Sequence, residues 1–326
     1  MAEPKLARET DGHVIVVAFP DIARWAAGNS GLPYVWSFDS GLPGPHAAIQ
    51  ALTHGNEVCG AIALDFLLGH GVRPARGKLS FCFANVAAFH TWNPGEPFKS
   101  RFVDEDFNRV WGSAVLDGDR NSAELRRARE LRSFYDTVDY LLDIHSMSDP
   151  CPPLMLAGAR QKGVDLALAL GFPAHIVVDA GHAAGRRLRD YGPFDDAGDP
   201  RAALLIECGQ HWTAESPAVA LQASLRFLRH FGLAGSDLLE RYLDTREAPR
   251  PRVIEVTDSI PIRSDAFSFV WPQDDSLTVV PRAGSLVARD GEREIRTPYD
   301  TCALVMPMRR RAKPGDTAVR MGRFVG

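Results

Sequence analysis

Cysteine is scarce in this chain, which carries five among its 326 residues. The five are odd in number, widely scattered and without paired short spacing, so they do not form the pattern of a disulfide framework. Their arrangement favours reduced thiols in a cytosol. The positions are Cys59, Cys82, Cys151, Cys208 and Cys302.

Long apolar runs and an excess of positive charge are also missing. No apolar stretch approaches the roughly 20 residues needed to cross a bilayer, and residues 1–10 lack the apolar core of a signal peptide. The net charge of −4 gives no support for nucleic-acid binding, and Arg309 to Arg311 is most simply a solvated patch. We therefore expect a cytoplasmic protein with neither a membrane nor a nucleic acid as partner; homo-oligomer formation stays open.

What is present is ordinary globular composition, with 45% hydrophobic and 24% charged residues. Strand-like apolar runs alternate with helical patterns, which predicts an α/β fold whose mixed, largely parallel sheet is sandwiched by helices. The strand-like runs lie near 13–19, 47–53, 78–84, 139–145, 153–157, 174–178 and 203–207, and the helical patterns near 57–69, 122–136, 162–170 and 214–231.

The pattern changes after Gly232. A charged, helix-like stretch at 236–246 leads to Pro249-Arg250-Pro251, and from Val253 onward short alternating runs are punctuated by glycine and proline. We predict a catalytic domain at 1–235 and a smaller C-terminal β domain at 236–326.

A histidine and a glutamate stand three positions apart where the second apolar run ends. His54 and Glu57 lie at a strand-to-helix corner, where Gly55 permits a tight turn. Zinc binds neutral imidazole and carboxylate, and a catalytic zinc site has three protein ligands with a fourth position open for water. The alternatives are a structural histidine and a first-turn glutamate favoured by the helix dipole.

The best candidate for a third ligand is His145, which ends the apolar run at 139–145. Both histidines would lie at strand ends, where open α/β sheets bind their ligands. Asp143 would face the same way as His145 and could hydrogen-bond the far imidazole nitrogen, or it could be a buried acid paired with an arginine. His211 could line the pocket. The histidines expected to be structural or solvated are His13, His46, His70, His90, His175, His182 and His230.

Four motifs in one order resemble the aspartoacylase and succinylglutamate desuccinylase family, relatives of the zinc carboxypeptidases. They are His54-Gly55-Asn56-Glu57, the Asp-x-Asn-Arg segment at 106–109, the Asp-x-His strand end at 143–145 and the Glu-x-Gly strand end at 207–209. The resemblance spans most of residues 45–215. The spacer between Glu57 and His145 is similar to the shorter one of the deacylases rather than that of true carboxypeptidases.

The resemblance implies a role for each matching residue. His54, Glu57 and His145 match the ligands of one zinc ion, and Glu207 matches the general base and proton shuttle. Arg101 matches the arginine that polarises the scissile carbonyl, and Asn108 with Arg109 matches the pair that grips a substrate carboxylate. Segments 283–300 and 313–316 look similar to the family's lipoyl-like β module, which roofs the zinc cleft. No lysine stands in the turn at 300–302, so a carrier function is not expected.

These residues suit the hydrolysis of an amide, which needs an activated water, a charge sink for the oxyanion and a proton for the leaving amine. Considered alone, Glu207 could instead be paired with an arginine, and Arg109 could form a surface salt bridge to Asp104 or Asp106. We expect a zinc-dependent amidohydrolase acting on a small N-acyl amino acid or a related amide that bears a carboxylate. The alternatives are a metallocarboxypeptidase acting on short peptides and a zinc-stabilised binding protein without catalysis. The sequence leaves open the acyl group, the amine and whether Tyr299 reaches the pocket.

Overall fold

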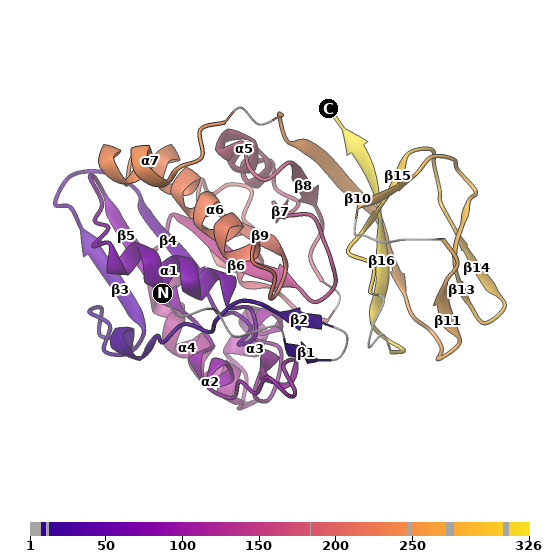
Figure 1. Cartoon of the computed structure of the whole chain (residues 1–326), viewed down its shortest axis with the longest axis horizontal. Helices are drawn as coiled ribbons and strands as arrows, with labels where there is room; N and C mark the ends of the chain where they lie inside the picture. The colour runs from indigo at the N-terminus through magenta and orange to yellow at the C-terminus, as the bar shows by residue number, and fades with distance from the viewer. Residues whose placement is uncertain (1–7, 11–12, 183, 247–248, 272–276, 309–312) are drawn as a thin grey trace.

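A computed structural model describes residues 8–10, 13–182, 184–246, 249–271, 277–308 and 313–326. The arginine run at 309–311 lies outside these residues, as does the side chain of His13. Helices surround a long twisted sheet in the larger part of the molecule, and the C-terminal strands, orange to yellow in Figure 1, extend that sheet on one side.

The strands are short, apart from four of eight to ten residues. Their bounds are β1 Arg8–Thr10, β2 His13–Ile15, β3 Val35–Asp39, β4 His46–Ala51, β5 Lys78–Phe83, β6 Tyr140–Met147, β7 Leu154–Leu156, β8 His175–Val178, β9 Ala202–Gln210, β10 Arg252–Pro261, β11 Phe267–Phe269, β12 Thr278–Val280, β13 Leu286–Asp290, β14 Arg293–Arg296, β15 Cys302–Val305 and β16 Thr317–Val325.

The helices include both α-helices and short 3₁₀ turns. The α-helices are α1 Cys59–Gly69, α2 Val86–Phe89, α3 Ser113–Leu116, α4 Ala123–Tyr135, α5 Gln161–Leu170, α6 Ser216–His230 and α7 Ser236–Tyr242. The 3₁₀ turns are η1 Ala23–Trp25, η2 Lys99–Arg101, η3 Phe107–Arg109, η4 Leu188–Asp190 and η5 Gly192–Phe194. Among the described residues, none of these helices has the length and apolar character that a membrane crossing requires.

Eleven of the described strands form one sheet in the order β12-β15-β16-β10-β8-β7-β9-β6-β4-β5-β3. The central strands β5, β4, β6 and β9 are mutually parallel, whereas β3 and β7 join antiparallel. Every residue of β4 and β9 is buried, as expected for parallel strands covered on both faces. The predicted α/β class is therefore confirmed.

Helices cover both faces of the central strands because each presents an apolar stripe. Helix α4 begins after Ser122, whose hydroxyl accepts a hydrogen bond from the Leu125 amide, and its apolar side packs with Phe107 and Trp111. Helices α1, α5 and α6 contribute to a separate, larger apolar cluster. The two clusters account for the predicted helical sandwich.

The C-terminal strands continue the same sheet. Strand β10 pairs in parallel with β8 and antiparallel with β16, while β11, β13 and β14 form a small sheet of their own. The division at residue 235 stays a prediction, because backbone pairing runs across it. Two residues of β16, Thr317 and Arg320, line the same cavity as the candidate site residues.

Candidate functional site

The corner between β4 and α1 is held by backbone contacts. The Gly55 amide donates to the Arg101 carbonyl at 3.1 Å, and the Glu57 amide donates to the His54 carbonyl at 3.2 Å. A Cβ on Gly55 would lie 2.4 Å from backbone atoms of Ala88, Phe89 and Ser100. Glycine is therefore required here by the close approach of two other backbone segments, the Ala88–Phe89 peptide and the Ser100 carbonyl, rather than by its φ angle.

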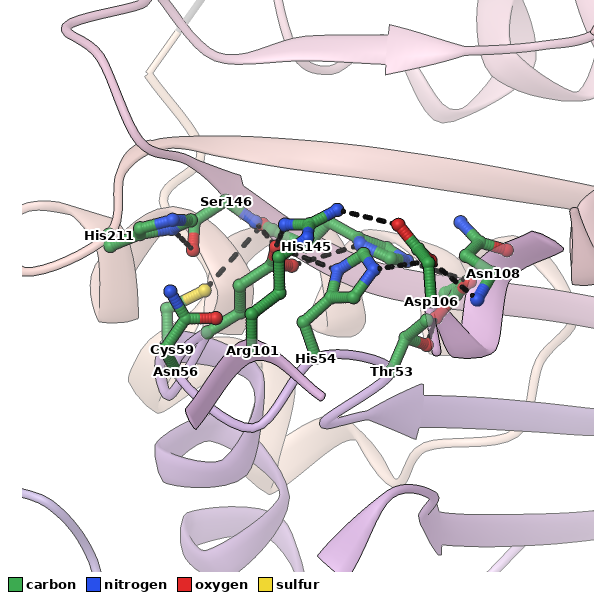
Figure 2. Close-up of polar contacts among 12 residues, drawn as sticks. Thr53, His54, Asn56, Cys59, Arg101, Asp106, Asn108, His145, Ser146 and His211 are labelled. Carbon is green, nitrogen blue, oxygen red and sulfur yellow. Dashed lines mark hydrogen bonds and ion pairs between the residues drawn. The ribbon is translucent and has the colours of Figure 1, made fainter. Parts of the chain in front are cut away.

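His54, Glu57 and His145 form a buried group that we call the His–Glu–His cluster. Figure 2 shows its two histidines beside Arg101 and Asp106. Nδ1 of His54 lies 2.8 Å from one Glu57 oxygen, and Nδ1 of His145 lies 2.9 Å from the other. One nitrogen or oxygen from each residue lies within 4.8 Å of the others. Two imidazole nitrogens and one carboxylate oxygen are the donor set of a catalytic zinc site, so these residues fit the metal.

A second carboxylate holds the far nitrogen of each imidazole. Nε2 of His54 lies 3.0 Å from Asp106, and Nε2 of His145 lies 2.9 Å from Asp143. Such contacts fix the ring so that the other nitrogen faces a metal. The sequence left two roles open for Asp143, a contact with His145 or an ion pair with an arginine. The structure shows the contact with His145, and no arginine among the described residues pairs with Asp143.

The buried side of Asp143 is fixed in turn by two donors. Its Oδ1 accepts hydrogen bonds from Gln50 Nε2 and Thr53 Oγ1, each at 2.9 Å. The Tyr135 hydroxyl in turn donates to the Gln50 amide oxygen and so extends this series of hydrogen bonds. The orientation of His145 therefore depends on a continuous buried network that reaches the core.

Charges inside the cluster stabilise one another. Burial alone would raise the pKa of Glu57, but the two imidazoles hold it well below its usual range. Burial alone would lower the pKa of His145, but Asp143 and Glu57 hold it well above its usual range. A buried site that stabilises positive charge in this way suits a bound cation.

Arg101 and the segment 106–109 form one wall of the site. Arg101 donates to Glu57 and to Asp106, each at 3.2 Å, and about a third of its side chain is exposed to the cavity. The Asn108 amide oxygen accepts from the Leu188 amide at 3.0 Å.

Arg109 donates from Nη1 to the Asn108 carbonyl at 2.7 Å, whereas its contact with Asp106 is loose, at 4.0 Å. Burial lowers the pKa of Arg109 to about 10, and the neighbouring charge of Arg187 adds to the effect. The salt bridge to Asp106 considered from the sequence is thus a weak contact.

Glu207 lies on β9 opposite His145 in the sheet register and is 8% exposed. Its Oε2 has no hydrogen-bond partner among the described residues, and no arginine there forms an ion pair with it. Burial raises the pKa of Glu207 to about 8, although His145 and Arg101 oppose the shift. A buried carboxyl group left unsatisfied costs stability, and groups of this kind concentrate at functional sites.

The predicted residues surround one cavity of about 550 Å³. Its wall includes all seven candidate residues and also His211, whose Nδ1 lies 2.8 Å from the Ser146 hydroxyl. Tyr299 is not among the lining residues; its hydroxyl lies 2.8 Å from that of Thr257. The candidates that line the cavity are His54, Glu57, Arg101, Asn108, Arg109, His145 and Glu207.

Three basic side chains that the sequence did not single out as site residues also line the cavity. His182, expected to be structural or solvated, lies in its wall together with Arg187 and Arg320. Arg187 donates twice to Asp179, at 2.8 and 3.1 Å. None of the three stands in a motif at a strand end, so the sequence carried no local signal for them.

The fold and the site together define an α/β protein with a metal-competent cluster at the carboxyl ends of parallel strands. Comparison with known proteins agrees with the family resemblance found in the sequence. Residues 43–194 match the family model described as the succinylglutamate desuccinylase/aspartoacylase catalytic domain. The resemblance to this family is therefore confirmed over that part of the chain.

Individual relatives show how far the similarity extends. Aspartoacylase from Xenopus tropicalis is 36% identical over 114 residues, which are 32% of this chain and 34% of the relative, so the match spans about a third of that protein. Succinylglutamate desuccinylase from Vibrio parahaemolyticus shares the fold with a TM-score of 0.66 and 17% identity, over 90% of this chain and 87% of that one. Murine aminoacylase 3 gives a TM-score of 0.60 and 18% identity, over 87% and 96%.

Proposed function

We propose that this protein is a zinc-dependent, cytoplasmic deacylase that hydrolyses the amide bond of a small N-acyl amino acid or a related amide bearing a carboxylate. The observation that carries the proposal is the position of Glu207 in the same cavity as the His–Glu–His cluster, as a buried carboxyl group whose Oε2 has no hydrogen-bond partner among the described residues. Five free cysteines support a reducing compartment.

The His–Glu–His cluster would hold one zinc ion per chain. When bound, zinc lowers the pKa of a water molecule to about 7 and acts as a Lewis acid toward a carbonyl. Asp106 and Asp143 orient the imidazoles and keep their Nδ1 atoms directed at Glu57.

Glu207 acts as the proton carrier. Its carboxylate accepts a proton from the attacking water and then delivers that proton to the departing amine nitrogen. A carboxyl group whose pKa is about 8 can both accept and release a proton near neutral pH. The absence of a competing hydrogen bond at Oε2, within the described residues, leaves that oxygen available for both transfers.

Arg101, Asn108 and Arg109 position the substrate. Arg101 faces the cavity beside Glu57 and donates a hydrogen bond to the developing oxyanion, an effect worth roughly 3 to 4 kcal/mol by analogy with oxyanion holes. The planar fork of Arg109 binds the substrate carboxylate through two parallel hydrogen bonds, with Asn108 beside it.

A panel of N-acyl amino acids tests the proposal, with amine release by zinc-loaded protein as the readout. Unblocked dipeptides and C-terminally extended peptides belong in the same panel. Preferential release of amine from N-acyl amino acids supports the deacylase. Faster removal of C-terminal residues from peptides would favour a metallocarboxypeptidase, and binding without any turnover would favour a binding protein.

Replacing Arg109 with lysine should raise KM by roughly 10- to 100-fold, because one charge-assisted hydrogen bond is worth about 1.5 to 3 kcal/mol and an ammonium cannot form both. Steady-state kinetics on the best substrate of the panel measures the change. Arg120→Lys is the matched control, since Arg120 is exposed and pairs only with Glu105 among the described residues. Equal turnover of a substrate and its carboxamide analogue by the unmutated protein would show that no carboxylate is recognised.

A further inference from the structure

One stretch of the cavity wall is apolar and adjoins Glu207. Leu205 lies two residues before Glu207 on β9, so the two side chains point to the same face of the sheet. Leu156 of β7 pairs with Leu205 in the sheet register, and both leucines line the cavity. An apolar surface therefore begins beside the carboxyl group that carries the proton.

The C-terminal part of the chain completes this surface through Met306. This residue follows β15, packs against the apolar cluster that contains Leu156 and Leu205, and lines the cavity. Its backbone is left-handed, with a φ of 48°. Such a conformation is costly for a residue other than glycine, and it concentrates at ligand-binding and catalytic sites. We call Leu156, Leu205 and Met306 the apolar patch.

The cavity has a polar part as well, around Arg109. Asp106 lies 4.0 Å from this guanidinium, and the Asn108 carbonyl accepts a hydrogen bond from it. On the side of β16 the patch is bordered by Arg320, which stands opposite Val305 in the sheet register. The volume of about 550 Å³ lies within the range of roughly 300 to 1,000 Å³ that holds drug-sized ligands. There is therefore room for a carboxylate at Arg109 and for an apolar chain on the patch.

We propose that the apolar patch is a specificity-determining subsite for the acyl group, so that the enzyme prefers N-acyl amino acids whose acyl group is an aliphatic chain longer than acetyl. The inference rests on the proposed function, in which Arg109 binds the carboxylate and an N-acyl amino acid carries that carboxylate on its amine half. The chain attached to the scissile carbonyl then extends from Glu207 over the patch. Burial of its methylene groups favours binding.

Two isomers that extend N-acetylalanine by two methylene groups test the inference. N-butyrylalanine carries them on the acyl group, and N-acetylnorvaline carries them on the side chain of the amino acid. The zinc-loaded enzyme should have a kcat/KM roughly tenfold higher with N-butyrylalanine than with N-acetylalanine, because each fully buried methylene is worth about fourfold. The gain with N-acetylnorvaline should be smaller. Equal values for the three substrates would overturn the inference, as would a larger gain with N-acetylnorvaline.

The variant Met306→Asn should reduce the preference for N-butyrylalanine to roughly threefold or less, because a polar amide replaces part of the apolar patch. Asparagine tolerates the left-handed backbone of this position. The matched control is Val279→Asn, since Val279 is an exposed apolar residue on β12 and the cavity wall formed by the described residues does not include it. Val279→Asn should keep the preference of the unmutated enzyme. A preference that survives in Met306→Asn would overturn the inference and leave the proposed function intact.

Calorimetry with acetate and butyrate provides a readout that does not need turnover. Zinc-loaded protein should bind butyrate more tightly than acetate and with a more negative heat-capacity change, which marks apolar burial. The preference should weaken in Met306→Asn and persist in Val279→Asn. If no panel member is hydrolysed while this pattern holds, the proposed function fails and the apolar subsite stands. Should Met306→Asn fail to fold, Met306→Gln replaces it, with a reduced preference for butyrate expected; an unchanged preference would count against the inference.

Discussion

Replacing Glu207 with glutamine should lower kcat by roughly 10²- to 10⁴-fold, the range typical for loss of a general acid–base group. The fall should affect kcat more than KM, because the proton transfers take place in the transition state. Zinc content should stay at that of the unmutated protein, since the His–Glu–His cluster does not include Glu207. The melting temperature should not fall, because the substitution removes a carboxyl group whose buried Oε2 has no hydrogen-bond partner among the described residues.

Three measurements on one preparation of Glu207→Gln separate the possible roles of this residue: zinc content, melting temperature and kcat. A bracing role predicts a lower melting temperature, and a ligand role predicts lost zinc. Glu215→Gln is the control, because Glu215 is exposed and lies shortly after β9. A Glu207→Gln enzyme with near-normal kcat would rule out the proton-carrier role.

Replacing His145 with alanine should weaken zinc binding by more than the roughly 10- to 100-fold that loss of an outer carboxylate partner costs. The reason is that the cluster would keep only two of its three donors, and its carboxylate would lose a buried imidazole that lies 2.9 Å away. Elemental analysis after dialysis, together with competition against a chelator, measures the effect.

Two further variants give zinc affinities against which the His145→Ala result is compared. Asp143→Asn should weaken zinc binding by only roughly 10- to 100-fold, since it perturbs the orientation of the His145 ring and leaves that ligand in place. His230→Ala removes an exposed histidine and should have no effect. Full zinc occupancy and affinity in His145→Ala would show that the third ligand has been assigned to the wrong residue.

The central sheet and the meeting of His54 with His145 were predictable from the sequence for one physical reason. Both histidines follow short apolar runs, and the carboxyl ends of neighbouring parallel strands meet at one edge of a sheet. The structure has β4 and β6 as parallel neighbours, with Gln50 opposite Asp143. The short apolar runs and the position of each histidine at a strand end therefore predicted that the two candidate ligands meet.

Elements that depend on tertiary pairing were not predictable in the same way. The edge strand β3 was missed, because one buried, three half-buried and one exposed residue in succession show no alternation. The parallel pairing of β10 with β8 was also missed, since the residues of neither segment determine which strand it pairs with. That pairing helps to carry β16 and Arg320 to the cavity, and so an arginine far along the chain from the motifs became visible only in the structure.

The central claim is that the His–Glu–His cluster and Glu207 form one zinc-dependent hydrolytic site. It is tested most directly by adding zinc stepwise to chelated protein while following amine release from the N-acyl amino acid panel. Without metal, amine release should be negligible, and it should then rise linearly until about one zinc per chain is bound. Full release by protein verified to be metal-free, or no release from any panel member by the fully loaded protein, would contradict it.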